Sequence, residues 1–312
     1  MKYLVLGPGG QGAFAMLGYL KKIENQLGDL EEISGASCGA MIAFLMCTGK
    51  TIDQLFDLFL ETDMSPMNKL DLNNFLTTYG FVDTTYIRTH LIKCWGDRDP
   101  TFSELSKKLY VAAMCVSTGQ TQYFSRDTHP DMHVSEAVQM SCSIPVMMSA
   151  HKFQGKLYAD GGILESIPGL PFLGKMHRDI LCVSVKGSRV QEMPIENFKD
   201  YLGAIINGYI QSARIEYNLP TVTIGTGAFN LVDMAMVHED KLKLFIVGNL
   251  FPCIHQQDEP PMWSKDQYKC YESGGDNKID ASSQCGPGED QDAAVRKDSL
   301  VLGEESSDAT YD

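Results

Sequence analysis

The sequence predicts an α/β fold built around a mainly parallel central sheet. The chain opens with a short apolar run at 3–6, a glycine-rich loop, and a segment from Met16 to Leu27 in which apolar residues recur every three or four positions. That pattern is typical of a strand, a loop and one face of a helix. Two later apolar runs, 109–116 and 180–185, lack polar alternation, as strands buried on both faces of a sheet do.

The elements between these landmarks follow from local patterns. A brief strand fits residues 31–34, and an apolar helix follows at 41–45. Thr51 and Gln54 have the spacing of a capping box, which predicts that a helix begins there. Residues 61–80 are polar and methionine-bearing, so we expect a loop or a mobile cap.

The second half of the chain continues the alternation of helices and strands. A capping-box spelling at Thr101 predicts another helix start, and the polar stretch 118–131 predicts a hairpin-like excursion. The remaining expected elements are helices at 84–95, 135–143, 195–214 and 235–248, and strand-like runs at 154–158 and 221–224.

The charge is unevenly distributed and divides the chain into two parts. The net charge is −14, and residues 256–312 hold 14 Asp and Glu against 5 Lys and Arg. This part is also poor in apolar residues, so it cannot bury enough surface to offset the entropy of ordering. We therefore expect a folded domain at 1–255 and a disordered acidic tail at 256–312.

Composition also excludes several classes of protein. No basic run is present, so nucleic-acid binding and strong attraction to anionic membrane are not expected. The nine cysteines form no CxxC pair and have no zinc-site spacing, which favours reduced thiols in a cytoplasmic protein. No run of 18 apolar residues suggests a spanning helix, and the glycine loop interrupts the first apolar run before it could act as a signal sequence.

The pentapeptide Gly35-Ala36-Ser37-Cys38-Gly39 reads GxSxG and lies between a predicted strand and a predicted helix. That is the setting of a nucleophile elbow, in which glycines relieve clashes at a sharp bend and the serine is presented at a helix N-terminus. A serine hydroxyl attacks a carbonyl only when a base takes its proton and donors receive the oxyanion. A plain turn is the alternative.

The glycine cluster at 7–12 fits GxGxxG, which makes a dinucleotide site the first rival interpretation. Such a site needs an acidic residue near the end of the second strand, and Glu31-Glu32 lies near that distance. Here, however, the strand leads into GxSxG. The loop can instead aim the N–H groups of Gly9 and Gly10 at an oxyanion, whereas Pro8 has no N–H to donate.

An α/β-hydrolase shares GxSxG and is the second rival. Ser37 comes too early for that fold, because only one strand-helix unit precedes it. His177, His238 and His255 are available as later triad members, but none stands in a glycine turn. The other candidate base is Asp160, which follows a strand-like run and begins an Asp-Gly-Gly turn.

The three motifs, in this order, resemble the patatin-like phospholipase family. The resemblance covers about residues 2–250 and includes the segments 80–83, 101–105 and 137–145. It implies a three-layer α/β/α fold with a mainly parallel sheet, and Ser37 and Asp160 as a dyad without histidine. It further implies an oxyanion hole at Gly7, Gly9, Gly10, Gln11 and Gly12, an elbow framed by Gly35 and Gly39, and a turn at Gly161 and Gly162.

By this resemblance the protein is expected to be a serine lipid acyl hydrolase, of phospholipase A type or a related lipid esterase. It would work through an acyl-enzyme with no metal and no cofactor, and would meet its lipid as a peripheral protein at a membrane surface. Residues 64–76 are a candidate lid or interfacial patch, and no protein partner is indicated.

The chain also departs from the family pattern. The loop has Pro8 in its middle and Gln11 where a basic residue is usual, and the segment before Pro168 lacks the usual asparagine. The alternative function is therefore a catalytically weakened lipid-binding or regulatory protein on the same fold.

Overall fold

The computed structural model describes residues 1–68, 70–187, 198, 201, 204 and 215–252 of the 312-residue chain. All of them belong to the first of two units of the chain, Met1–Pro261. The expected tail at 256–312 and nearly all of the expected helix at 195–214 lie outside the described residues.

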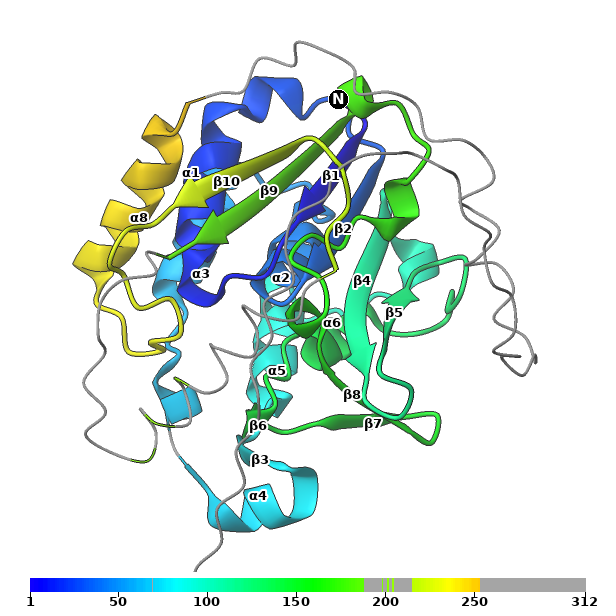
Figure 1. Cartoon of the computed structure of the whole chain (residues 1–312), viewed down its shortest axis with the longest axis vertical. Coiled ribbons are helices and arrows are strands. Elements are labelled where there is room, and N and C mark those ends of the chain that lie inside the picture. Colours follow the sequence, from blue (N-terminus) through cyan, green and yellow to red (C-terminus); the bar gives the residue numbers. More distant parts are fainter. Residues whose placement is uncertain (69, 188–197, 199–200, 202–203, 205–214, 253–312) are drawn as a thin grey trace, which may run out of the picture. The chain divides into compact units, whose positions relative to one another are not determined.

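The centre of the described part is an eight-stranded sheet. Its strands run in the order β10 (Thr221–Gly225), β9 (Ile180–Lys186), β1 (Tyr3–Leu6), β2 (Glu32–Ala36), β4 (Lys108–Cys115), β8 (Lys156–Asp160) and β7 (His151–Phe153), and β5 (Gln120–Phe124) also pairs with β4. The pairings from β10 to β4 are parallel, and β5, β8 and β7 are antiparallel to their neighbours. The predicted α/β class with a mainly parallel sheet is confirmed (Figure 1).

Strand β4 pairs with three other strands, and this arrangement positions the two segments that contain Ser37 and Asp160. One edge pairs with β5 over residues 111–115. The other edge pairs first with β2, ending at Ala36 opposite Ala112, and then with β8, ending at Asp160 opposite Ala113. Strands β2 and β8 thus approach each other end to end along one edge of β4.

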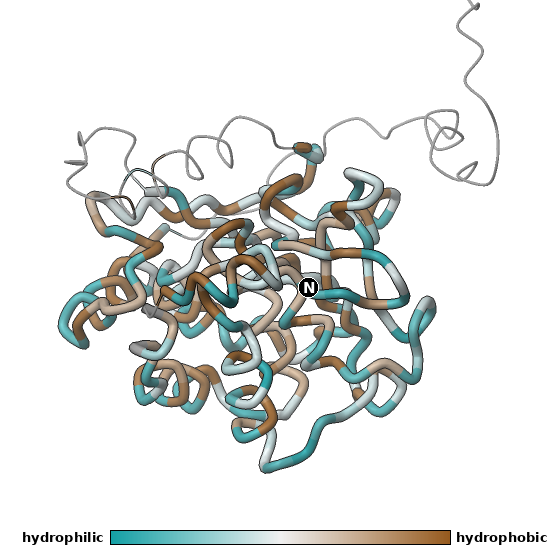
Figure 2. The backbone as a smooth tube through the Cα atoms, turned by 90° about the horizontal axis from the view of Figure 1, so that it is seen from below, coloured by the Kyte–Doolittle hydropathy of each residue, from teal (hydrophilic) through white to brown (hydrophobic). Residues whose placement is uncertain are grey.

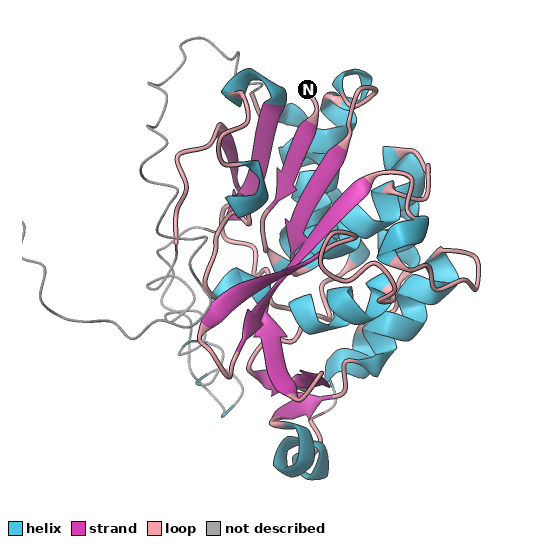
Figure 3. Cartoon of the chain, turned by 90° about the vertical axis from the view of Figure 1, so that its right-hand side faces the viewer, coloured by secondary structure: helices cyan, strands magenta, loops and turns pink. Residues whose placement is uncertain are grey.

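Helices cover one face of the sheet and build the larger hydrophobic core (Figure 3). They are α1 (Ala13–Lys22), α2 (Cys38–Met46), α3 (Ile52–Glu61), α5 (Thr85–Cys94), α6 (Val134–Ser141) and α8 (His238–Leu250). Side chains from the sheet contribute to two hydrophobic cores because they alternate along each strand. In β1, Leu4 and Leu6 belong to the larger core, and Val5 belongs to a smaller core on the opposite face. Phe172, from a 3-10 helix at Leu170–Phe172, covers that second face.

Most strand and helix positions follow the sequence pattern, with differences of a few residues at the ends. The Thr51 capping box forms and starts α3. The Thr101 capping box also forms, but the helix it starts is a single 3-10 turn, Phe102–Glu104, because the backbone becomes extended at Leu105 on the way to β4. Hydrophilic stretches lie mainly in the peripheral turns (Figure 2).

The expectation of a loop at 61–80 is wrong for part of that segment. A short helix, α4 (Leu72–Thr78), forms there and leads into β3 (Gly80–Val82), which pairs with β6 (Val146–Met148). The helix is stabilised at its N-terminus because the Asp71 carboxylate accepts hydrogen bonds from the N–H groups of Asn73 and Asn74. It ends at Tyr79, which adopts a left-handed conformation with φ 64°.

Helices α1 and α8 cross at two glycines. A Cβ atom on Gly18 would lie 2.0 Å from the carbonyl oxygen of Phe245, and one on Gly248 would lie 1.8 Å from that of Ala15. The helix backbones can approach this closely only because both positions lack a side chain.

None of the described helices is both long and apolar enough to cross a membrane.

Candidate active site

Ser37 occupies a sharp bend between the end of β2 and the start of α2. Its backbone, with φ 55° and ψ −129°, lies in a region that non-glycine residues rarely adopt. The bend is possible because a Cβ atom on Gly35 would lie 2.6 Å from Gly39 O, and one on Gly39 would lie 2.4 Å from Leu6 O. The GxSxG segment therefore has the strand-turn-helix form of a nucleophile elbow.

Ser141, on α6, supports this bend from behind. The Ser37 N–H donates to Ser141 Oγ at 2.8 Å, and the Ser141 hydroxyl donates to the carbonyl of Ala112 at 2.6 Å. Both groups are buried, so the bridge ties the strained residue to β4 and α6. The motifs did not reveal Ser141, although the 137–145 segment was part of the family resemblance.

Asp160 is the last residue of β8 and is buried, with 4% of its surface exposed. Its Oδ1 accepts a hydrogen bond of 2.7 Å from the N–H of Gly162, and its own N–H donates to Ser143 O at 2.8 Å. A Cβ atom on Gly161 would lie 2.1 Å from Ala112 O, so the turn packs directly against β4. These contacts fix the carboxylate at the end of the strand.

The register of β4 brings Ser37 and Asp160 together. Ala36, directly before Ser37, pairs with Ala112, and Asp160 pairs with the next residue, Ala113. Consecutive residues of a strand are separated by about 3.3 Å, so the two ends meet at one point of the sheet. Ser37 and Asp160 both line one cavity of about 530 Å³.

The glycine loop contributes two N–H groups to the same region. The N–H groups of the flanking residues are committed to the fold: Gly7 donates to Val183 O, Gln11 to Leu231 O and Gly12 to Gly9 O. Those of Gly9 and Gly10 instead face the sulfur of Cys38, the residue after Ser37. Of the five loop residues implied by the resemblance, Gly9 and Gly10 thus present donors beside the serine.

The two atypical loop residues do not displace these donors. Pro8 packs against the Asp-Gly-Gly turn, where a Cβ atom on Gly162 would lie 2.4 Å from Pro8 Cβ. The Gln11 side chain is buried, and its Nε2 donates weakly to the sulfur of Met234 at 3.8 Å.

The thiol of Cys38 indicates how the charges are arranged around Ser37. Burial raises its pKa to about 12, and the negative charge of Asp160 acts in the same direction, whereas the N–H groups of Gly9, Gly39 and Gly10 oppose the rise. The Cys38 sulfur therefore interacts electrostatically with both the Asp160 carboxylate and the N–H donors. At neutral pH it therefore stays a thiol.

The expectation of reduced, core-filling cysteines is confirmed for the described part of the chain. All six cysteines there are free and buried, namely Cys38, Cys47, Cys94, Cys115, Cys142 and Cys182. Burial raises the pKa of Cys142 well above its ordinary value, and Asp160 adds to the effect.

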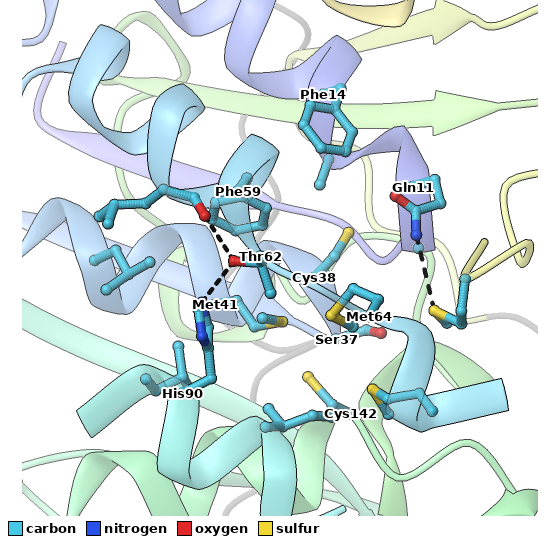
Figure 4. A pocket seen from close by; sticks show the side chains of 18 of the residues that line it. Gln11, Phe14, Ser37, Cys38, Met41, Phe59, Thr62, Met64, His90 and Cys142 are labelled. Carbon is cyan, nitrogen blue, oxygen red and sulfur yellow. Dashed lines mark hydrogen bonds between the residues drawn. The ribbon is translucent and has the colours of Figure 1, made fainter. Parts of the chain in front are cut away.

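A second, smaller cavity of about 80 Å³ also reaches Ser37 (Figure 4). Its lining is largely apolar, with contributions from Phe14, Met41, Leu45, Leu58, Phe59, Met64, Met67, Ile87, Leu91, Ile144 and Met148. Two polar groups on its wall pair with each other: Thr62 Oγ1 donates to Leu58 O and lies 2.6 Å from His90 Nε2, which therefore donates to it. Burial lowers the pKa of His90, which keeps its ring neutral.

The histidines considered as triad members do not line either cavity in the described part of the chain. His177 lies in a 3-10 turn before β9, and His238 begins α8. His255 lies outside the described residues.

An elbow serine and a buried aspartate thus line one cavity at the end of a mainly parallel sheet. Residues 4–173 match the patatin-like phospholipase family, and the chain belongs to that family. Membership of this family places the protein among lipid ester hydrolases.

Relatives of the chain include two proteins of large viruses. An uncharacterized protein of Acanthamoeba polyphaga mimivirus is 30% identical over 238 residues, which cover 70% of this chain and 80% of the relative. A protein of Invertebrate iridescent virus 6 named "Probable lipid hydrolase" is 26% identical over 178 residues, which cover 54% of this chain and 61% of the relative.

The crystal structure of VipD from Legionella pneumophila resembles this one with a TM-score of 0.55 and 17% sequence identity, over 80% of this chain and 65% of that chain. At this identity the similarity shows a shared fold.

Proposed function

We propose that this protein hydrolyses carboxylic esters of lipids with a dyad of Ser37 and Asp160, as a phospholipase of A type or a related lipid esterase. The observation that carries the proposal is the register of β4, which places the elbow serine and the buried carboxylate at neighbouring points of one strand edge. The substrate is met by peripheral contact with a membrane surface.

The proposed reaction proceeds in two halves. Ser37 Oγ bonds to the ester carbonyl carbon while its proton passes to the Asp160 carboxylate, and the N–H groups of Gly9 and Gly10 bind the oxyanion. Collapse of this intermediate breaks the ester bond, and the leaving alcohol takes the proton from Asp160. Water then gives a proton to Asp160 and attacks the acyl-enzyme carbonyl. As the bond to Ser37 Oγ breaks, that oxygen takes the proton from Asp160, which releases the fatty acid and restores both residues.

The two cavities that meet at Ser37 support different roles for the two parts of a lipid. The smaller cavity is apolar and suits the acyl chain. The larger one suits the alcohol or headgroup, because its lining includes Ser166, Ser184, Lys186, Glu216 and Thr223.

The alternative of a weakened, regulatory protein rests on Pro8 and Gln11. Neither residue removes the N–H groups of Gly9 and Gly10 from the site, which supports the enzyme.

A fluorophosphonate probe distinguishes the two. We expect stoichiometric labelling of Ser37, found by mass spectrometry of the peptide that contains it, and no labelling of a folded Ser37→Ala variant. A folded wild-type protein that fails to react would favour the regulatory alternative.

The assignment of the smaller cavity is tested at Met41, which lines it one helical turn after the serine. Met41→Trp fills the space, so we expect kcat/KM for a long-chain nitrophenyl ester to fall by about tenfold while that for the acetate ester changes little. Met41→Leu conserves volume and should keep the wild-type preference. Equal losses on both esters in the Trp variant would place the acyl chain elsewhere.

A further inference from the structure

Helix α4 exposes both of its leucines, which is unusual for a helix in a water-soluble protein. Two of its polar side chains face the protein, since Asn74 Nδ2 donates to Ser149 Oγ at 2.9 Å and Thr78 Oγ1 donates to the same oxygen at 3.0 Å, whereas its other two polar residues are exposed. Its leucines face outward, with Leu72 64% exposed and Leu76 69% exposed. A helix normally buries its apolar side chains and exposes its polar ones, so the exposed leucines indicate a surface that binds an apolar partner.

The neighbouring residues extend the same surface. Leu70 is 47% exposed and Tyr79 is 62% exposed. We call Leu70, Leu72, Leu76 and Tyr79 the lipid tip. The stretch 72–82 contains no charged residue, and the two charged residues beside Leu70, Lys69 and Asp71, have opposite signs. The segment 69–82 therefore has no net charge, although the whole chain carries a net charge of −14, and it has no cluster of basic residues that would attract an anionic surface.

The lipid tip is joined to the wall of the apolar cavity. Phe75 of α4 stacks on Phe81 of β3, with ring centroids 4.5 Å apart. Strand β3 pairs with β6, whose Met148 lines the cavity, as do Met64 and Met67 shortly before α4. Figure 1 shows α4 beyond the small sheet of β3 and β6, away from the strands of the central sheet.

We propose that the lipid tip inserts into the surface of a phospholipid bilayer whose zwitterionic headgroups carry no net charge, and that it brings acyl chains to the cavity at Ser37. Its leucines supply apolar area, and a tyrosine at its border suits the membrane–water interface. The net negative charge of the chain opposes binding to anionic lipid, so apolar burial drives the contact. The use of the contact for catalysis rests on the proposed function, but the contact itself does not.

The test measures vesicle binding without turnover. The full-length Ser37→Ala protein is sedimented with phosphatidylcholine vesicles, with and without the added pair Leu72→Ser and Leu76→Ser. We expect this pair to weaken binding by about tenfold or more, because two leucines no longer enter the bilayer. Their exposure makes loss of folding unexpected, and circular dichroism checks it.

A matched control comes from α8, where Leu242 and Ile246 have the same spacing and are 44% and 53% exposed. Replacing both by Ser should leave binding unchanged. Replacing half of the phosphatidylcholine by phosphatidylserine should not strengthen binding, and added salt should not weaken it.

Several results would overturn the proposal. These are retained binding in the α4 variant, equal loss in the α8 control, absence of binding in the Ser37→Ala parent, or binding that requires phosphatidylserine and disappears in salt. A dimer in light scattering that the α4 substitutions dissociate would make this face a contact between copies instead. The protein that keeps Ser37 is assayed separately for hydrolysis of a soluble short-chain ester. No hydrolysis there would contradict the proposed function, whereas the result on vesicle binding would still stand.

Discussion

Replacing Ser37 by Ala is expected to lower kcat/KM for a short-chain nitrophenyl ester by at least about three orders of magnitude, because the acyl-enzyme can no longer form. Asp160→Asn should cost a comparable factor. Asparagine has the shape of aspartate and an oxygen that can still accept the Gly162 N–H at 2.7 Å, but it cannot take the serine proton. The loss would therefore report the missing base and not a displaced turn.

The two residues should also behave as a unit. A variant with both substitutions is expected to be no slower than the slower single variant, since either change alone disables the same step. Ser106→Ala is the matched control: this serine is exposed and lines neither cavity, so the activity should remain. Substantial hydrolysis by folded Ser37→Ala or Asp160→Asn protein would contradict the dyad.

The secondary-structure elements around Ser37 could be predicted from local sequence patterns. The strand-loop-helix order at the N-terminus depends on short-range periodicity and glycine placement, and β1, α1, β2 and α2 form close to where these patterns indicated. The meeting of Ser37 with Asp160 depends on how β2 and β8 share an edge of β4. Pairing between distant strands leaves no periodic signal in either strand, so only the family resemblance linked the two residues.

Two other features show where pattern reasoning fails. The polar, methionine-bearing composition of 61–80 predicts a loop or a mobile cap, but α4 forms within this segment and directs Asn74 and Thr78 toward Ser149. Ser141 lies in an ordinary helical run, and its role depends on a hydroxyl placed between the Ser37 N–H and the carbonyl of Ala112. Hydrogen bonds of this kind become visible only once the fold has brought the elements together.

Gly248→Ala should destabilise the protein by about 2 kcal/mol or more, although alanine is normally the better helix former by about 1 kcal/mol. The new Cβ atom would lie 1.8 Å from Ala15 O, and a backbone atom cannot move aside without separating α1 from α8. The measurement is the midpoint of urea unfolding. Gly28→Ala, at a glycine with nothing within 4 Å of the added atom, should change stability by no more than about 0.5 kcal/mol.

Gly248→Ala should also lower the catalytic rate. Helix α1 begins at Ala13, directly after the loop that carries the N–H groups of Gly9 and Gly10. If α8 displaces α1, these donors move relative to the oxyanion, so kcat should fall more than KM rises when the folded variant is assayed below its unfolding transition. Unchanged stability would show that the helices do not cross this closely. Lost stability with unchanged kcat would show that the loop is held by its own contacts, among them the Gln11 N–H to Leu231 O at 2.7 Å.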